Sequence, residues 1–349
     1  MTRITKTIFG KLDEQEIYCF TLMNAKGNSV SIINFGGIIT SWKIKDKNYS
    51  ERNIVAGFDN LQDYIDDSAY FGCIAGRYAN RIVNGRFSFN GDSYELSRND
   101  GDNHLHGGKR GFGKRTWDAS ITERENPVLS LHYFSADGEE GYPGNLNVKI
   151  EYSYTEDDEL LIGYYAETDK PTPVNLTSHC YFNLTGNVNK GILNHSLLIN
   201  ADQYTPVNES LVPTGELKPV NKTAFDFREQ TRISDNINNE PDCYDHNFVL
   251  NKTDERFSFA ASLFDPENKI ELSIFTTEPG LQLYTGVQLD GTIINRDGKP
   301  LNKYAALCLE TQHFPDSPNL PHFPSTILMP GEKYFSKTVY KIITDPTST

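Results

Sequence analysis

The chain has 349 residues, and its 47 acidic against 33 basic side chains give a formal net charge of −14 at pH 7. A protein this acidic is repelled by phosphate backbones and anionic lipid surfaces, which argues against nucleic acid or a membrane as a partner. No stretch approaches the roughly 20 apolar residues that span a bilayer, and the N-terminus lacks the apolar core of a secretory signal.

Helical periodicity is scarce along the chain. The first regular element that we expect is a short helix over residues 59–66, where Asp59 caps the first turn and Gln62 follows three residues later. An aromatic content of 12%, with 19 Tyr and 20 Phe, favours strands for most of the remainder.

Turn signals separate short runs with strand character. Asn-Gly and Asp-Gly pairs supply the positive φ angles of tight hairpin turns, and they occur at 84–85, 90–91, 290–291 and 297–298. Alternating or β-branched runs that predict strands lie at 86–90, 146–152 and 269–275. The pattern therefore predicts a mainly antiparallel β structure.

The chain shows neither a β-α-β rhythm nor an internal repeat, and no linker marks a domain boundary. We therefore expect one all-β domain over residues 1–349 with few short helices. The five cysteines are scattered and none forms a Cys-x-x-Cys pair, so we expect reduced thiols in a cytoplasmic protein.

The first segment with chemical character is the run GRYANRI at 76–82. Arg77 and Arg81 flank Asn80 beside small residues, and an arginine fork suits hydroxyls and carboxylates alike. A surface salt bridge is the alternative interpretation of these arginines.

Two histidines stand two residues apart in the run NHLHGG at 103–108. On a strand, His104 and His106 would share a face, a spacing that metal-binding barrels use. A metal would need further ligands, which His179 and Glu310 could supply. We favour two hydrogen-bonding histidines beside a Gly-rich loop, and we expect no metal.

The loop that follows matches the phosphate-binding pattern G-x-x-x-x-G-K over residues 108–114. The next position of that pattern must offer a hydroxyl to magnesium, but here it is Arg115. No apolar parallel strand precedes the loop either. We therefore reject a nucleotide site.

The most informative stretch is the run NLTSHCYFN at 175–183, which we expect to form a strand. With period two, one face is mainly apolar, whereas the other carries Asn175, Thr177, His179, Tyr181 and Asn183. That second face has no Lys or Glu, unlike most solvated faces. Its imidazole, phenol and carboxamide groups suit a hydroxyl-rich, sugar-like ligand.

A carboxylate ends the apolar run at 304–309. Glu310 at the end of a buried strand loses solvation, which raises its pKa towards the range of a general base. The alternative is a glutamate that caps a strand in solvent, but the polar loop at 311–319 favours a functional role. Weaker signals are Asp245 between aromatic residues, and Gln282 with Tyr284 on one strand face.

Taken together, these segments resemble the aldose 1-epimerases, or galactose mutarotases. The matching runs are GRYANRI 76–82, NHLHGG 103–108, NLTSHCYFNL 175–184, YDHNF 244–248, PGLQLYT 279–285 and ETQHFPDSPN 310–319, with NFGG 34–37 and PGE 330–332 at the two ends. They follow the family's order and span nearly the whole chain, so the joint match is highly specific.

The resemblance implies a large antiparallel β-sandwich with one active cleft, and a cofactor-independent isomerase of free hexoses. It places the catalytic base at Glu310 and the catalytic acid at His179, with His106 helping at the ring oxygen. Contacts to sugar hydroxyls carry over to Asn80, Arg81, Asp245 and Gln282, and more weakly to Tyr181. None of these positions departs from the family pattern.

The implied reaction interconverts the α and β anomers of hexoses such as galactose and glucose. Glu310 takes the proton of the C1 hydroxyl, protonated His179 donates to the ring oxygen, and the roles exchange on ring closure. We expect the two opposite charges to lower the pKa of Glu310 and to raise that of His179, and we expect a bell-shaped pH profile.

Three alternatives stay open at this point. The first is a carbohydrate-binding module without turnover, and the second is a glycosidase that uses Asp245 and Glu310 as its two carboxylates. The third is an epimerase for a phosphorylated hexose, which would need more basic side chains. A monosaccharide is the expected partner, the chain is a monomer or homodimer, and the acidic stretch at 235–245 could hold calcium.

Overall fold

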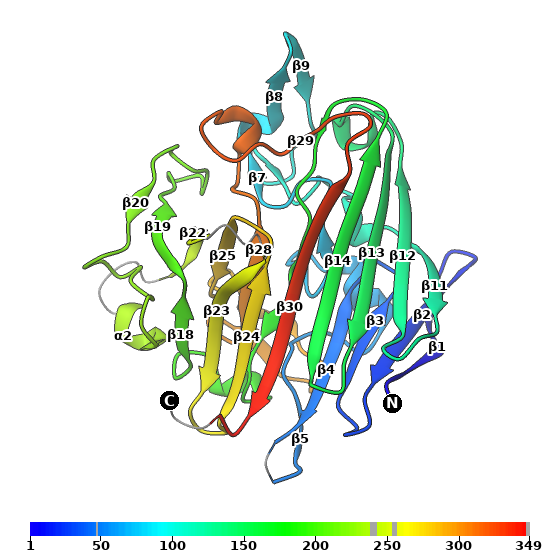
Figure 1. The fold of residues 1–349 in the computed structure, drawn as a ribbon, viewed down its shortest axis with the longest axis vertical. Coiled ribbons are helices and arrows are strands. Elements are labelled where there is room, and N and C mark those ends of the chain that lie inside the picture. Colours follow the sequence, from blue (N-terminus) through cyan, green and yellow to red (C-terminus); the bar gives the residue numbers. More distant parts are fainter. Residues whose placement is uncertain (47, 238–242, 253–256, 347–349) are drawn as a thin grey trace.

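The computed structural model describes residues 1–46, 48–237, 243–252 and 257–346, and it has two layers of antiparallel sheet (Figure 1). A nine-stranded sheet forms the front layer in this view. A five-stranded sheet from the N-terminal part and a six-stranded sheet lie side by side behind it. The prediction of an all-β antiparallel sandwich is confirmed.

The nine-stranded sheet runs in the spatial order β11-β12-β13-β14-β30-β24-β23-β18-β21. Its strands are β11 Asp118–Thr122, β12 Val128–Ser135, β13 Leu146–Tyr154, β14 Glu159–Thr168, β30 Tyr334–Thr344, β24 Ile270–Thr276, β23 Ser258–Asp265, β18 Ser196–Ile199 and β21 Thr231–Arg232. The last strand of the chain, β30, thus lies in the middle of the sheet between β14 and β24.

The second layer consists of two sheets. The five-stranded sheet is β1 Arg3–Leu12, β2 Gln15–Met23, β3 Ser29–Ile33, β4 Ile39–Lys45 and β5 Glu51–Asn53. The six-stranded sheet is, in spatial order, β17 Tyr181–Phe182, β28 Leu307–Gln312, β25 Gly280–Tyr284, β22 Asp245–Leu250, β19 Ala201–Thr205 and β20 Lys218–Pro219.

Short elements complete the described chain. The two-stranded pairs are β6 Ile74–Ala75 with β16 Thr177–Ser178, β7 Arg81–Ile82 with β10 His104–Leu105, β8 Arg86–Phe89 with β9 Asp92–Glu95, β15 Thr172–Pro173 with β29 Ile327–Leu328, and β26 Asp290–Ile294 with β27 Pro300–Asn302. The α-helices are α1 Leu61–Asp66 and α2 Ile233–Ile237. No helix among the described residues is long and apolar enough to cross a membrane.

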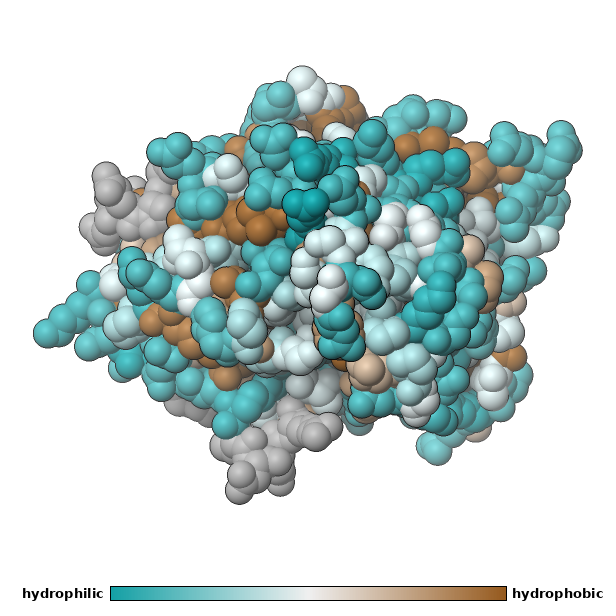
Figure 2. All heavy atoms as spheres, turned by 90° about the horizontal axis from the view of Figure 1, so that it is seen from above, coloured by the Kyte–Doolittle hydropathy of each residue, from teal (hydrophilic) through white to brown (hydrophobic). Residues whose placement is uncertain are grey.

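Strand alternation explains how the core forms. In β13, Val148, Ile150 and Tyr152 are buried, whereas the intervening Lys149 and Glu151 are partly exposed. The same alternation in facing strands fills the space between the layers with apolar side chains, as successive residues of a strand point to opposite faces. Seen from above, the surface is mostly hydrophilic, with hydrophobic residues in separate small groups (Figure 2).

Several local predictions can be compared with the structure. Asn90-Gly91 forms the two-residue turn between β8 and β9, with φ angles of 51° and 90°, as predicted. The helix near residue 60 is present, but its cap is Asn60 and not Asp59, because the Asn60 side chain accepts the N–H of Asp63 at 3.0 Å. Asp290-Gly291 lies within β26 and does not form the predicted turn.

The strand predicted over 175–183 is interrupted. β16 pairs with β6 and β17 pairs with β28, and His179 lies in the gap between these two short strands. Both faces of the segment are buried, so the period-two pattern does not separate a packed face from a ligand face here. Residues 238–242 of the acidic stretch considered for calcium lie outside the described residues.

Candidate active site

The six-stranded sheet separates core side chains from site side chains by alternation. Leu281 of β25 and Leu309 of β28 point into the core, so their neighbours Gln282 and Glu310 point to the opposite face. Gln282 and Glu310 are direct partners across the two strands. Asp245, at the start of the neighbouring strand β22, reaches the same face.

On this face the structure has a cavity of 350 Å³. Its lining includes seven of the eight predicted site residues: Asn80, Arg81, His106, His179, Tyr181, Asp245 and Glu310. The eighth residue, Gln282, lies beside the cavity and donates from Nε2 to Oδ1 of Asp245 at 2.7 Å. The fold therefore brings together residues that are up to 230 positions apart in the sequence.

Two histidines and one glutamate lie at the centre of the cavity. His179 Nε2 is 3.7 Å from Glu310 Oε1, and the rings of His106 and His179 have centroids 5.0 Å apart. One nitrogen or oxygen atom from each of the three side chains lies within 4.8 Å of the others. Oε2 of Glu310 is buried and has no hydrogen-bond partner among the described residues, so its capacity to accept a hydrogen bond is unused.

The backbone around the histidines explains their fixed positions. The N–H of His179 donates to the carbonyl of Cys73 (2.8 Å), and its own carbonyl accepts from Gly72 (2.9 Å). His106 has a positive φ of 49°, and the N–H of Asn80 donates to its Nδ1 at 3.2 Å. A neutral imidazole with Nδ1 as acceptor carries its hydrogen on Nε2, so His106 is a hydrogen-bond donor towards the cavity.

Burial controls the protonation of this cluster. Desolvation lowers the pKa of His179 to about 4, and it raises the pKa of Glu310 well above its ordinary value, with a further increase from the nearby Asp245 carboxylate. Desolvation also lowers the pKa of His106. The expectation that opposite charges lower the pKa of Glu310 and raise that of His179 is therefore wrong, because the cost of burying charge outweighs their mutual attraction.

A charged pair borders the same cavity. Arg81 donates from Nε to Asp100 Oδ2 (2.7 Å) and from Nη1 to Asp245 Oδ2 (3.3 Å). Burial would lower the pKa of Arg81, but the charges of Asp245 and Asp100 outweigh burial and raise it. The guanidinium stays charged, with donors left for a ligand.

The cluster of His106, His179 and Glu310 has the size of a metal site. Its hydrogen-bonding pattern fits a metal poorly, because the Nε2 of His106 carries a hydrogen as long as Nδ1 accepts from the Asn80 N–H. A ring nitrogen must be deprotonated to coordinate a metal. The donors and acceptors match a hydroxyl-rich ligand better.

Comparison with known proteins identifies the family. The family model for aldose 1-epimerase matches residues 18–341. A galactose mutarotase from Rattus norvegicus is 40% identical over 344 residues, which cover 98% of this chain and 99% of the relative. An aldose 1-epimerase from Escherichia coli is 38% identical over 340 residues, with 95% and 97% covered.

The chain belongs to the aldose 1-epimerase family. It is accordingly an isomerase that interconverts the anomers of an aldose. Solved structures agree with this assignment. An aldose epimerase homologue from C. elegans has a TM-score of 0.87 at 28% identity, with 99% of each chain covered. A galactose 1-epimerase from Lactobacillus acidophilus also has a TM-score of 0.87, at 29% identity, with 98% of this chain and 99% of that chain covered.

Several polar residues of the aldose 1-epimerase motifs do not line the cavity. His104 points away from it, and its ring nitrogens contact Ser97 O and Tyr142 Oη at 2.6 Å each. The guanidinium of Arg77 is buried and donates to carbonyl groups such as that of Pro143 at 3.0 Å. The carboxamides of Asn175 and Asn183 bind other parts of the protein, and their Nδ2 groups donate to the carbonyl groups of Ala79 and Ala305.

Among the cavity residues that were not predicted, two contact predicted ones. The Tyr70 ring lies 4.6 Å from the ring of His106 and 5.9 Å from that of His179, and so shields both imidazoles from solvent. Asp100 holds Arg81. The turn-forming run Asn-Asp-Gly at 99–101, just before the histidine motif, is a signal that could have indicated Asp100.

The rejected phosphate loop has a clear structural explanation. The N–H groups of Lys109 and Arg110 donate to the carboxylate of Glu140 at 3.1 and 3.0 Å. Backbone N–H groups that would bind a phosphate are thus already occupied by an acidic side chain of the protein itself.

Proposed function

We propose that the substrate is a free hexose such as galactose or glucose, and that Glu310 and His179 are its catalytic base and acid. Glu310 accepts the proton of the C1 hydroxyl while His179 donates to the ring oxygen, with the Nε2–H of His106 assisting there. The ring opens to the aldehyde, the C1–C2 bond rotates, and closure by the reverse transfers gives the other anomer.

The observation that carries this proposal is the placement of Glu310. Its Oε2 is buried without a partner among the described residues, and its Oε1 lies 3.7 Å from His179 Nε2. A hydroxyl at this point can donate to the carboxylate while the adjacent ring oxygen accepts from an imidazole. A binding module would not require a carboxylate and an imidazole so arranged.

The expected protonation of the two side chains supports the same reaction. Burial raises the pKa of Glu310 and lowers that of His179, which favours a proton on Glu310 and an uncharged His179 ring. Transfer of that proton to His179 gives the ionised base and protonated acid without any change in net charge. A sugar hydroxyl between the two groups provides a path for this transfer.

The remaining predicted residues supply hydroxyl contacts. Arg81 donates and Asp245 accepts, while Asn80 and Tyr181 border the same cavity and Gln282 orients Asp245. The names of the rat and Lactobacillus relatives favour galactose as a substrate.

Ring opening transfers protons but no electrons, so the reaction needs no redox cofactor. The cytoplasmic location, the single domain and the monomer or homodimer stay predictions.

Polarimetry on freshly dissolved α-D-galactose in weakly catalytic buffer tests the proposal. We expect the wild-type protein to speed relaxation to the same final rotation, and Glu310→Gln and His179→Asn each to lower kcat by about 10²–10⁴-fold. Glu167→Gln and His132→Asn, two exposed positions of the nine-stranded sheet, are matched controls and should keep full activity. Sugar binding without acceleration by the wild-type protein would favour a binding module.

A further inference from the structure

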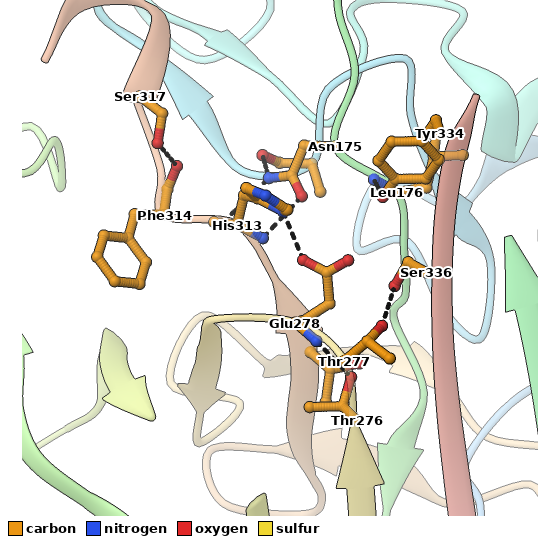
Figure 3. A network of polar contacts seen from close by, with 12 residues as sticks. Asn175, Leu176, Thr276, Thr277, Glu278, His313, Phe314, Ser317, Tyr334 and Ser336 are labelled. Carbon is orange, nitrogen blue, oxygen red and sulfur yellow. Dashed lines mark hydrogen bonds and ion pairs between the residues drawn. The ribbon is translucent and has the colours of Figure 1, made fainter. Parts of the chain in front are cut away.

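A buried ion pair lies outside the cavity, at the end of the strand that carries Glu310. His313 Nδ1 is 2.6 Å from Oε2 of Glu278, whose side chain is only 2% exposed (Figure 3). His313 follows β28 directly, and Glu278 lies in the turn from β24 to β25. Neither residue lines the sugar cavity.

The pKa shifts of this pair favour the charged forms, unlike those of the His179–Glu310 pair. Burial by itself would raise the pKa of Glu278 and lower that of His313. Their mutual charge and hydrogen bond oppose burial in both cases, and the Ser336 hydroxyl and the Lys252 charge lower the pKa of Glu278 further. The pKa of Glu278 is therefore below its ordinary value and that of His313 above. The result is a short, charge-assisted hydrogen bond, which fixes geometry more strictly than a neutral one.

The carboxamide of Asn175 connects this ion pair to a second segment of the site. Its Oδ1 accepts from the N–H of His313 at 2.9 Å (Figure 3). Its Nδ2 donates to the carbonyl groups of His313 and Ala79, at 3.2 Å each. The N–H of Ala79 donates in return to the carbonyl of Asn175 at 2.8 Å. Asn175 is wholly buried, so solvent does not compete for these bonds.

The three connected points lie close in sequence to the three segments that supply the site. His313 comes three residues after Glu310, Ala79 comes two residues before Arg81, and Asn175 comes four residues before His179. Because these spans are short, we expect a displacement at the contacts to shift the side chains in the cavity.

We propose that Asn175, Glu278 and His313, which we call the clamp, are positioning residues that hold Glu310 in register with Arg81 and His179 during anomer interconversion. The inference rests on the function proposed above. A misplacement of about 1 Å between reacting groups can cost about 10²-fold in rate. A buried ion pair is a weak source of stability compared with apolar packing, whereas it specifies one geometry, so positioning explains the charges of the clamp better than stabilisation does.

Two substitutions at one position test the clamp by polarimetry with α-D-galactose. His313→Ala removes the Nδ1 donor, whereas His313→Asn places an amide N–H near the former Nδ1. We expect His313→Ala to lower kcat by about 10- to 100-fold, with a change in KM of less than about threefold because the sugar contacts remain. His313→Asn should recover most of the lost kcat.

A core variant serves as the control for general destabilisation. Leu272→Ala, in β24, removes a buried apolar side chain away from the cavity and should lower Tm while it keeps the wild-type kcat. A His313→Ala protein with wild-type kcat and KM would overturn the clamp, and so would a loss of kcat no greater than that of Leu272→Ala at an equal fall in Tm.

The experiment distinguishes failure of the proposed function from failure of the clamp. Without acceleration by the wild-type protein, the proposed function fails and the clamp falls with it, whereas an active wild type with an equally active His313→Ala overturns the clamp alone. Should His313→Ala not fold, Glu278→Met keeps the side-chain length and removes the acceptor of the His313 hydrogen bond. The same loss of kcat is then expected, and wild-type kinetics would overturn the clamp.

Discussion

The Nε2 atom of His179 lies 3.7 Å from Oε1 of Glu310, and the two side chains are 6% and 2% exposed. Because burial disfavours charge on both groups, the pair holds one proton between them at pH values above the pKa of His179 and below that of Glu310. The reaction needs that number of protons, one for the acid and none for the base. If Glu310 is the base and His179 the acid as proposed, the same burial that shifts the two pKa values sets the expected pH range of activity.

We expect a bell-shaped dependence of kcat/KM on pH. Below the pKa of His179, which is about 4, both groups are protonated and no base remains. Above the raised pKa of Glu310, the pair has lost its proton and no acid remains. The acid limb should therefore lie near pH 4 and the alkaline limb well above the ordinary range of a glutamate. Polarimetric rates from pH 3.5 upwards, at about half-unit steps, measure both limbs, and a rate that falls neither towards pH 4 nor at alkaline pH would contradict a shared proton.

Asp245→Asn should affect both binding and the alkaline limb. The Asp245 carboxylate raises the pKa of Glu310, so its removal should shift the alkaline limb to lower pH. It also accepts from Arg81 and Gln282, and the loss of a charged acceptor should raise KM by about 10- to 100-fold. Measurement of kcat and KM across the pH range separates the two effects. An unchanged alkaline limb would show that Asp245 does not act on Glu310.

His106 should act through the hydrogen on its Nε2. Gln at this position can place an amide N–H near Nε2, whereas Ala removes the donor. We therefore expect His106→Ala to lower kcat by about 10²-fold and His106→Gln to lower it less, by about 10-fold. Equal losses in the two variants, measured by polarimetry at neutral pH, would argue against a simple donor role.

Chelation should leave the activity unchanged. Nδ1 of His106 accepts from Asn80, which places the hydrogen on Nε2 and makes this nitrogen a poor metal ligand. We expect the same kcat before and after dialysis against EDTA. A loss of activity that zinc restores would instead assign the cluster of His106, His179 and Glu310 to a metal.

The fold class could be predicted because strand patterns are local. Alternation in residues 146–152 and the Asn90-Gly91 turn depend only on the direction of successive side chains and on permitted φ angles. The interrupted strand around His179 could not be predicted in this way. Its two halves pair with different partners, β6 and β28, and such pairing depends on distant parts of the chain.

Among the candidate site residues, residue type and motif indicated the chemistry but not the placement. His104 and His106 have the same side chain, yet only His106 lines the cavity. The positive φ of His106 breaks the strand alternation, so its side chain does not point to the same face as that of His104. Asn175 was expected on a ligand face, but its carboxamide binds the backbone of His313 and Ala79.

By itself, the sequence determined the antiparallel β architecture, the membership of the aldose 1-epimerase family and the set of polar residues available for catalysis. Only the tertiary structure decided which of those residues meet and in what protonation state. The physical reason is that a pKa depends on burial and on neighbouring charges. For Glu310 these come from segments as far away in the sequence as Arg81 and Asp245.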